Sequence, residues 1–143
     1  MMTEVAGAGR RISVFFYGLF MDVELLRAKG IRPTNTRIAS VDGFVIHIGQ
    51  RATLLPQKDS SVYGVIMELT HLEIEQLYSE PSVGAYRPEA VIANLADGSR
   101  VPALCFNLPK TSDPEPPNPD YANRLRDLGR RLGLPSTFVE KIK

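Results

Sequence analysis

The sequence predicts one domain, over residues 1–143, that mixes β-strands with α-helices. A length of 143 residues suits one ordinary domain, and 43% hydrophobic residues are enough to bury its core. Short β-rich runs bounded by turn residues fill most of the chain, and helical spacing with capping residues occurs at several places among them. No repeat, heptad pattern or second domain boundary is visible, and we expect residues 1–11 to form a flexible start.

The first half of the chain reads as strand, tight turn, helix and then further strands. Residues 12–17 form a β-type run that ends at Gly18, and Asp22 caps a short helix that Gly30 closes. Three more strands are predicted by apolar and β-branched runs, namely residues 38–48, 52–55 and 62–69. The last of these is apolar on both faces, so we expect it to be central in the sheet.

The second half contains a hairpin followed by helices. Residues 86–94 and 100–106 flank Asp97-Gly98, the strongest hairpin signal in the chain, so these two strands should pair antiparallel. After a proline-rich connection, Asn118 and Pro119 supply the cap and first turn of a helix. Gly133 ends this helix, and a last short helix begins near Pro135.

Glu80 is the first candidate functional residue. Thr70 and Glu73 form a capping-box pair that starts a helix, and Pro81 prevents its continuation. Glu80 should therefore lie at the helix carboxyl end, where the macrodipole disfavours a carboxylate by a few tenths to ~1 kcal/mol. A carboxyl group that is protonated more readily, close to Tyr86, suits a general acid/base. The alternative is that Glu80 is a solvated loop residue.

The turn at Gly18 is the second candidate. A strand that ends in Tyr17-Gly18 and turns into a helix directs main-chain N–H groups at whatever lies over the turn, and those donors favour an anion or a developing oxyanion. The alternative is a simple tight turn whose donors are satisfied by Asp22 or by water.

Composition argues against several classes of partner. A net charge of +1 gives no electrostatic footprint for nucleic acid, and the basic group Arg126, Arg130 and Arg131 reads as the wet face of a helix. No run approaches the ~18 apolar residues of a membrane span, and no signal-peptide core is present. The single Cys105 excludes an internal disulfide, which suits a cytoplasmic location.

Residue types also argue against metal, nucleotide and nucleophilic chemistry. Two histidines, one cysteine and no clustered carboxylates leave no metal site, and no glycine-rich phosphate loop occurs, so we expect no cofactor. His47 in an apolar strand and His71 in a first helical turn read as structural residues. Cys105 alternates with core positions and reads as a buried, inert thiol.

Five segments in this order resemble the γ-glutamylcyclotransferase (AIG2-like) family over about residues 12–142. They are Phe16-Tyr17-Gly18-Leu19-Phe20, at the substrate loop of that family; residues 51–56 with Val62-Tyr63-Gly64-Val65; Leu77-Tyr78-Ser79-Glu80, at its catalytic acid; Tyr86-Arg87; and a tail over residues 119–139. Leu19 stands where the family carries Ser or Thr, Phe20 where a small or polar residue is common, and Pro81 where glycine is frequent. Main-chain donors at the loop would survive these changes.

The resemblance implies an α+β fold with a small mixed, largely antiparallel, barrel-like sheet, surrounding helices and a site at one mouth. It also implies the reaction, in which the α-amine of a γ-glutamyl amide attacks its own γ-carbonyl and yields 5-oxoproline and a free amine. Glu80 would move the protons, and the rival acids Glu73, Glu75 and Glu89 read as solvated. The substrate would be held by a turn and two tyrosines: Tyr17, Gly18, Leu19 and Phe20, with Tyr86 and Tyr121.

Two alternatives remain open at this point. A same-fold enzyme could release a different γ-linked amine by the same mechanism, and Leu19 and Pro81 fit a catalytically inactive small-molecule-binding or interaction module of the same fold. The sequence identifies neither the leaving amine nor the oligomeric state.

Overall fold

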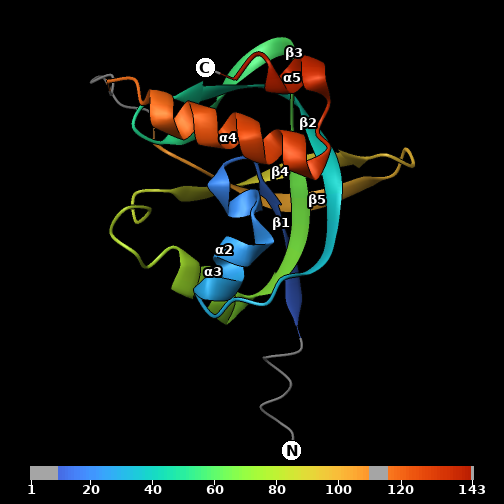
Figure 1. Ribbon diagram of the computed structural model, residues 1–143. Helices are drawn as coiled ribbons and strands as arrows, with labels where there is room; N and C mark the ends of the chain where they lie inside the picture. The colour runs from blue at the N-terminus through green and yellow to red at the C-terminus, as the bar shows by residue number, and fades with distance from the viewer. Residues whose placement is uncertain (1–9, 110–115, 143) are drawn as a thin grey trace, which may run out of the picture.

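The protein is built around a five-stranded β-barrel (Figure 1). The computed structural model describes residues 10–109 and 116–142. The strands are β1 (Arg11–Phe16), β2 (Thr34–Ile48), β3 (Ala52–Thr70), β4 (Arg87–Leu95) and β5 (Arg100–Asn107), and the barrel closes in the order β1-β3-β2-β4-β5. Neighbouring strands pair antiparallel, except that β1 and β5 are parallel where Val14 faces Leu104. The predicted small, mixed and largely antiparallel barrel is confirmed. The expected flexible start falls mainly on residues 1–9, outside the described part.

In the described part of the chain, four helices and one 3₁₀ turn accompany the barrel. They are η1 (Leu19–Met21), α2 (Val23–Ala28), α3 (His71–Leu77), α4 (Pro119–Leu132) and α5 (Ser136–Val139). Figure 1 shows α4 crossing in front of the barrel, with α2 below it. The turn η1 contacts both of these helices and the end of β1, so the segment after β1 lies at the junction of barrel and helices.

The helices begin and end at the residues that their capping signals predict. The Asp22 carboxylate accepts the Glu24 N–H at 3.0 Å, and Thr70 and Glu73 form the reciprocal capping box, with N···O distances of 3.1 and 2.8 Å. Asn118 caps α4 by accepting the Tyr121 N–H at 3.2 Å. Gly133 ends α4 in the left-handed conformation with φ 83°.

The prediction of two strands over residues 52–55 and 62–69 was wrong, because β3 runs through both. Asp42 pairs with Ser61 and Phe44 pairs with Pro56, so residues 57–60 lie opposite Gly43 alone, whose φ is 87°. The polar residues 57–60, which separate the two predicted strands in the sequence, lie in this irregularity, and the strand continues past it. The expectation that residues 62–69 are central is confirmed, since this part of β3 lies between β1 and β2.

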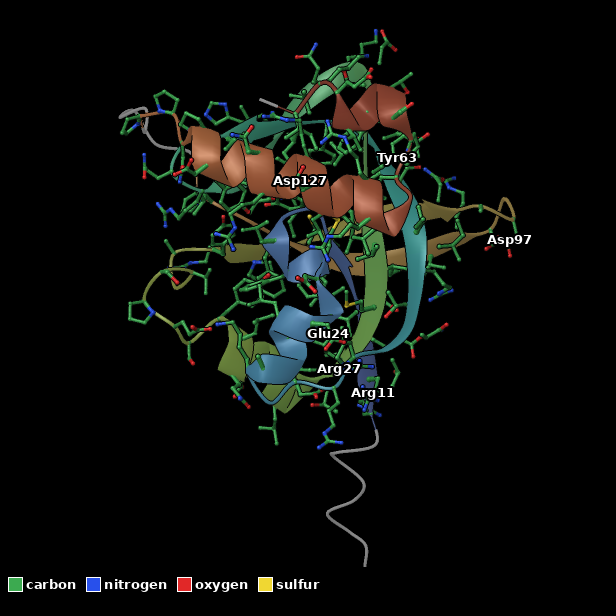
Figure 2. All side chains as sticks on the ribbon, in the orientation of Figure 1. Arg11, Glu24, Arg27, Tyr63, Asp97 and Asp127 are labelled. Carbon is green, nitrogen blue, oxygen red and sulfur yellow. The ribbon has the colours of Figure 1, made fainter. Side chains whose placement is uncertain are left out.

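The predicted hairpin joins β4 and β5 at Asp97-Gly98. Gly98 has φ 88°, a conformation that favours glycine, and the Leu95 N–H donates to the Ser99 carbonyl at 2.9 Å. Asp97 lies at the projecting tip of the hairpin (Figure 2). This tip is therefore remote from the helices beside η1.

The core fills the barrel and the space beneath the helices. The largest fully buried side chains include Phe15, Ile66, Met67, Leu69 and Leu125. Gly64 on β3 lies so close to β1 that a Cβ there would stand 2.2 Å from the Phe16 carbonyl oxygen. Among the helices of the described ranges, none has the length and apolar character needed to cross a bilayer.

Candidate active site

One pocket, with a cavity volume of about 420 Å³, contains the candidate site residues predicted from the sequence. It is lined by all seven of them: Tyr17, Gly18, Leu19, Phe20, Glu80, Tyr86 and Tyr121. They come from the segment after β1, from the loop between α3 and β4, and from the first turn of α4. The fold thus brings distant segments to one cavity, while the role of each residue there stays a prediction.

Glu80 is the acidic residue of this pocket. Among the described residues that line it, no other side chain is a carboxylate. Both Glu80 oxygens accept hydrogen bonds from the Lys29 ammonium, at 2.9 and 2.7 Å. The two side chains are 40% and 29% exposed, so the ion pair is partly shielded from solvent. Lys29 thus places a cationic partner directly beside the Glu80 carboxylate.

The α2 and α3 helices hold Lys29 beside Glu80. Lys29 is the C-cap residue of α2, and its carbonyl accepts a 2.8 Å hydrogen bond from Gln76 on α3. Glu80 follows α3, where its carbonyl accepts the Val83 N–H at 3.1 Å in a tight loop. Pro81 is compatible with this loop and leaves the Glu80 side chain in the pocket.

The three rival acids face other partners. Glu73 serves the capping box and accepts the Arg32 N–H at 2.7 Å. Glu75 pairs with His71 at 2.9 Å on the exposed face of α3. Glu89 accepts a 2.6 Å hydrogen bond from the Asn107 side chain on the neighbouring strand. None of these three carboxylates lines the pocket.

Not all main-chain N–H groups of the turn after β1 are available to a ligand. The Leu19 N–H donates to the Tyr121 hydroxyl at 3.4 Å, so this donor is already engaged. The N–H groups of Gly18 and Phe20 make no hydrogen bond within the described part of the chain. Gly18 has φ −108° and is needed for space, because a Cβ there would stand 2.7 Å from the Tyr121 hydroxyl oxygen.

Aromatic rings form a large part of the pocket wall. Tyr78 stacks on Phe106 with ring centroids 4.0 Å apart, and the edge of Phe20 meets Tyr78 at 5.9 Å. Burial raises the pKa of the Tyr17, Tyr78 and Tyr121 hydroxyls, in the last case against lowering contributions from the Leu19 N–H and Arg124. These hydroxyls therefore remain protonated at neutral pH and can act as donors.

Several pocket residues were not predicted from the sequence: Lys29, Arg51, Tyr78, Phe106 and Arg124. Lys29 gave no signal, because it lies 51 residues from Glu80 and reads as an ordinary basic residue at a helix end. Tyr78 was named only as part of the segment that carries Glu80, and no role was predicted for it. Cys105, expected to be inert, is fully buried, and burial raises its thiol pKa to about 12.

Solved structures share this fold. A γ-glutamyl cyclotransferase superposes with a TM-score of 0.78 at 19% identity, covering 93% of this chain and 86% of the other. An uncharacterised protein from Homo sapiens gives 0.78 at 18% identity, covering 92% and 86%. YkqA from Bacillus subtilis gives 0.73 at 23% identity, covering 96% of this chain and 54% of YkqA. At these identities the similarity concerns the fold alone.

Sequence comparison supplies the family. None of the curated protein sequences compared with the chain is similar enough to count as a match. The family model described as "Gamma-glutamyl cyclotransferase, AIG2-like" matches residues 14–123, which include the end of β1, the turn after it, Glu80 and Tyr121. This match extends over most of the chain and over the seven candidate site residues that line the pocket. The chain therefore belongs to the AIG2-like γ-glutamyl cyclotransferase family.

Proposed function

We propose that the protein converts a γ-glutamyl amide, or a γ-glutamyl amino acid, into 5-oxoproline and a free amine. The single observation that carries this proposal is that Glu80 is the one carboxylate among the described residues of an aromatic pocket in a cyclotransferase-family barrel. The substrate's α-nitrogen forms a bond to its γ-carbonyl carbon, the bond from that carbon to the leaving nitrogen breaks, and no water is consumed. We also infer a cytoplasmic location, as expected from the sequence.

Glu80 would act as both general base and general acid. Its carboxylate, which forms the ion pair with Lys29, is the group in the pocket that would accept a proton. The α-ammonium of the substrate must lose a proton before it can attack, and Glu80 would take it. The same carboxyl group would then return a proton to the departing nitrogen. An arriving α-ammonium can replace Lys29 as the cationic partner of Glu80.

The pocket would accelerate the reaction mainly by holding the substrate bent. The nucleophile is part of the substrate, so correct orientation alone supplies an effective molarity of order 10⁵ M or more. A cavity of about 420 Å³ accommodates a small γ-glutamyl compound. No protein nucleophile and no metal is needed for this step, and the described residues contain no group of three His, Cys, Asp or Glu side chains placed to hold a metal ion.

The turn after β1 would bind the anionic end of the substrate. The N–H groups of Gly18 and Phe20 are donors without a hydrogen bond in the described residues, and Arg124 lines the same pocket. A carboxylate placed there would gain both main-chain hydrogen bonds and a guanidinium partner. Tyr86 and Tyr121 would form the adjoining walls.

The test is a panel of γ-glutamyl amino acids and γ-glutamyl amines incubated with the purified protein. We expect 5-oxoproline and the free amine to appear in equal amounts for at least one member. Release of glutamate in place of 5-oxoproline would indicate hydrolysis and contradict the proposed cyclisation.

A second function is favoured by the Lys29–Glu80 contact itself. Lys29 holds both carboxylate oxygens, and a pair that persists with ligand bound leaves no base to start the reaction. The protein would then bind a small γ-glutamyl compound without converting it. Calorimetry with 5-oxoproline and with uncleaved substrates separates the two functions, since a binding module binds substrate with no product formed.

A further inference from the structure

The tyrosines of the pocket differ in whether their hydroxyl groups donate hydrogen bonds to the protein. Tyr17 donates to the Phe106 carbonyl at 2.7 Å or to the Asn107 side-chain oxygen at 2.9 Å. Tyr86 donates to the Ala52 carbonyl. The hydroxyls of these two pocket residues therefore hold barrel strands and neighbouring loops together.

Tyr78 has no such partner. Its ring is fixed by stacking on Phe106 and by the edge contact with Phe20, and it lines the pocket. Its hydroxyl makes no hydrogen bond with any residue that the structure describes. Every fully buried side-chain oxygen among the described residues has a hydrogen-bond partner, so the Tyr78 hydroxyl is not fully buried. Because Tyr78 lines the pocket, we take this hydroxyl to face the pocket. A donor held rigidly in an aromatic wall is costly to leave unsatisfied once a ligand has expelled water.

The surroundings of Tyr78 indicate which ligand group it suits. The groups that interact electrostatically with its hydroxyl are Cys105, Tyr86 and Tyr121, and none of them is a cation. Tyr121, in contrast, lies within the electrostatic influence of Arg124. A substrate carboxylate would find a charge partner, Arg124, near Tyr121. A neutral carbonyl oxygen that gains charge during the reaction fits a neutral, fixed donor.

We propose that Tyr78 is a further catalytic residue, whose hydroxyl donates a hydrogen bond to the γ-carbonyl oxygen of the substrate and stabilises the oxyanion formed when the α-amine attacks. This inference rests on the proposed function. Tyr78 lies two residues before Glu80, on the segment that also carries the acid. The carbonyl carbon would thus be activated by one side chain of this segment and the protons moved by another.

The test compares Tyr78→Phe with Tyr63→Phe, a matched control. Tyr63 lies outside the pocket, packed against Phe138 with ring centroids 5.7 Å apart (Figure 2). Steady-state kinetics with a γ-glutamyl amide should show kcat reduced by about 10²-fold or more in Tyr78→Phe, with KM changed less than about threefold. Tyr63→Phe should keep kcat within about twofold of the wild type. The thermal midpoint of Tyr78→Phe should not fall, since no protein hydrogen bond is lost.

Each outcome decides the proposal. An unchanged kcat in Tyr78→Phe overturns the role of Tyr78 and leaves the cyclisation intact. A raised KM with unchanged kcat shows binding of the ground state, and this overturns the oxyanion assignment. A lower thermal midpoint with proportionate loss of activity shows a structural hydroxyl. Absence of 5-oxoproline from the wild-type protein with every substrate refutes the proposed function, and the role of Tyr78 with it.

Discussion

Gly18 should tolerate a side chain only when the Tyr121 hydroxyl is removed. Its φ of −108° and ψ of −156° are extended values that alanine adopts without strain. The obstacle is the Tyr121 hydroxyl oxygen, which would lie 2.7 Å from the new Cβ. Tyr121 must therefore move in Gly18→Ala, and its 3.4 Å contact with the Leu19 N–H is lost.

The magnitude follows from two opposing contributions. Forcing a methyl group into a filled site costs about 1–3 kcal/mol. Replacing glycine by alanine where the backbone permits it gains about 0.4–1 kcal/mol through the unfolded state. We expect Gly18→Ala alone to lower the free energy of unfolding by about 1 kcal/mol. In a Tyr121→Phe background only the gain remains, so the same change should stabilise by about 0.5 kcal/mol.

Urea unfolding of four proteins, followed by circular dichroism, measures this coupling: the wild type, Gly18→Ala, Tyr121→Phe and the double variant. The cycle cancels the cost of Tyr121→Phe itself and isolates the contact. We expect a coupling free energy of ~1.5 kcal/mol. Additivity within about 0.5 kcal/mol would show that the Gly18–Tyr121 contact does not restrict this position.

Three further predictions concern the cap of α4, the buried thiol and metals. Asn118→Ala should lower the free energy of unfolding by about 1 kcal/mol, measured by urea denaturation, because the Tyr121 N–H loses its side-chain acceptor; an unchanged midpoint would show that water replaces the cap. Burial, reinforced by Glu89, raises the pKa of Cys105 from 9.0 to about 12, so the thiol is neutral in the folded protein at a pH where the unfolded chain ionises it. The stability that the neutral Cys105 thiol contributes is complete below pH 9 and is lost as the pH rises towards 12. Iodoacetamide at pH 8.5 should therefore label Cys105 only when the protein is unfolded in urea. Rapid labelling of the native protein would contradict this burial. Activity should survive incubation with a chelator, and a loss that Zn²⁺ or Mn²⁺ alone restores would disprove metal independence.

The sequence predicted those parts of the fold that local signals control. The caps at Asp22, Thr70 and Asn118 and the turn at Asp97-Gly98 depend on a few adjacent residues, and the structure confirms them. The polar run within β3 misled the prediction, because its pairing with β2 depends on a bulge at Gly43 that no adjacent pattern indicates. Closure of the barrel was expected from the family resemblance, not from the strand patterns.

In the candidate site, too, some features could be predicted from local sequence and others depend on the fold. The residues of the turn after β1 and Glu80 were found because they form recognisable segments. The ion pair between Lys29 and Glu80 joins two loops that are remote in sequence, so only the folded chain reveals it. The reason for glycine at position 18 is likewise tertiary, since the atom that excludes a side chain belongs to Tyr121 on α4. The distinction between Tyr78, whose hydroxyl has no partner among the described residues, and Tyr17 and Tyr86, whose hydroxyls do, is likewise visible only in the folded chain.

The most direct test of the central claim compares Glu80→Gln with Glu24→Gln. Both changes remove a carboxylate from an ion pair, but Glu24 pairs with Arg27 at 2.8 Å on the exposed face of α2, outside the pocket (Figure 2). With a γ-glutamyl amide, Glu80→Gln should fold like the wild type and lose at least ~10²-fold in kcat for 5-oxoproline formation, while Glu24→Gln stays within about twofold. A folded Glu80→Gln protein that forms 5-oxoproline at the rate of the wild type would contradict the assignment of Glu80 as the acid/base.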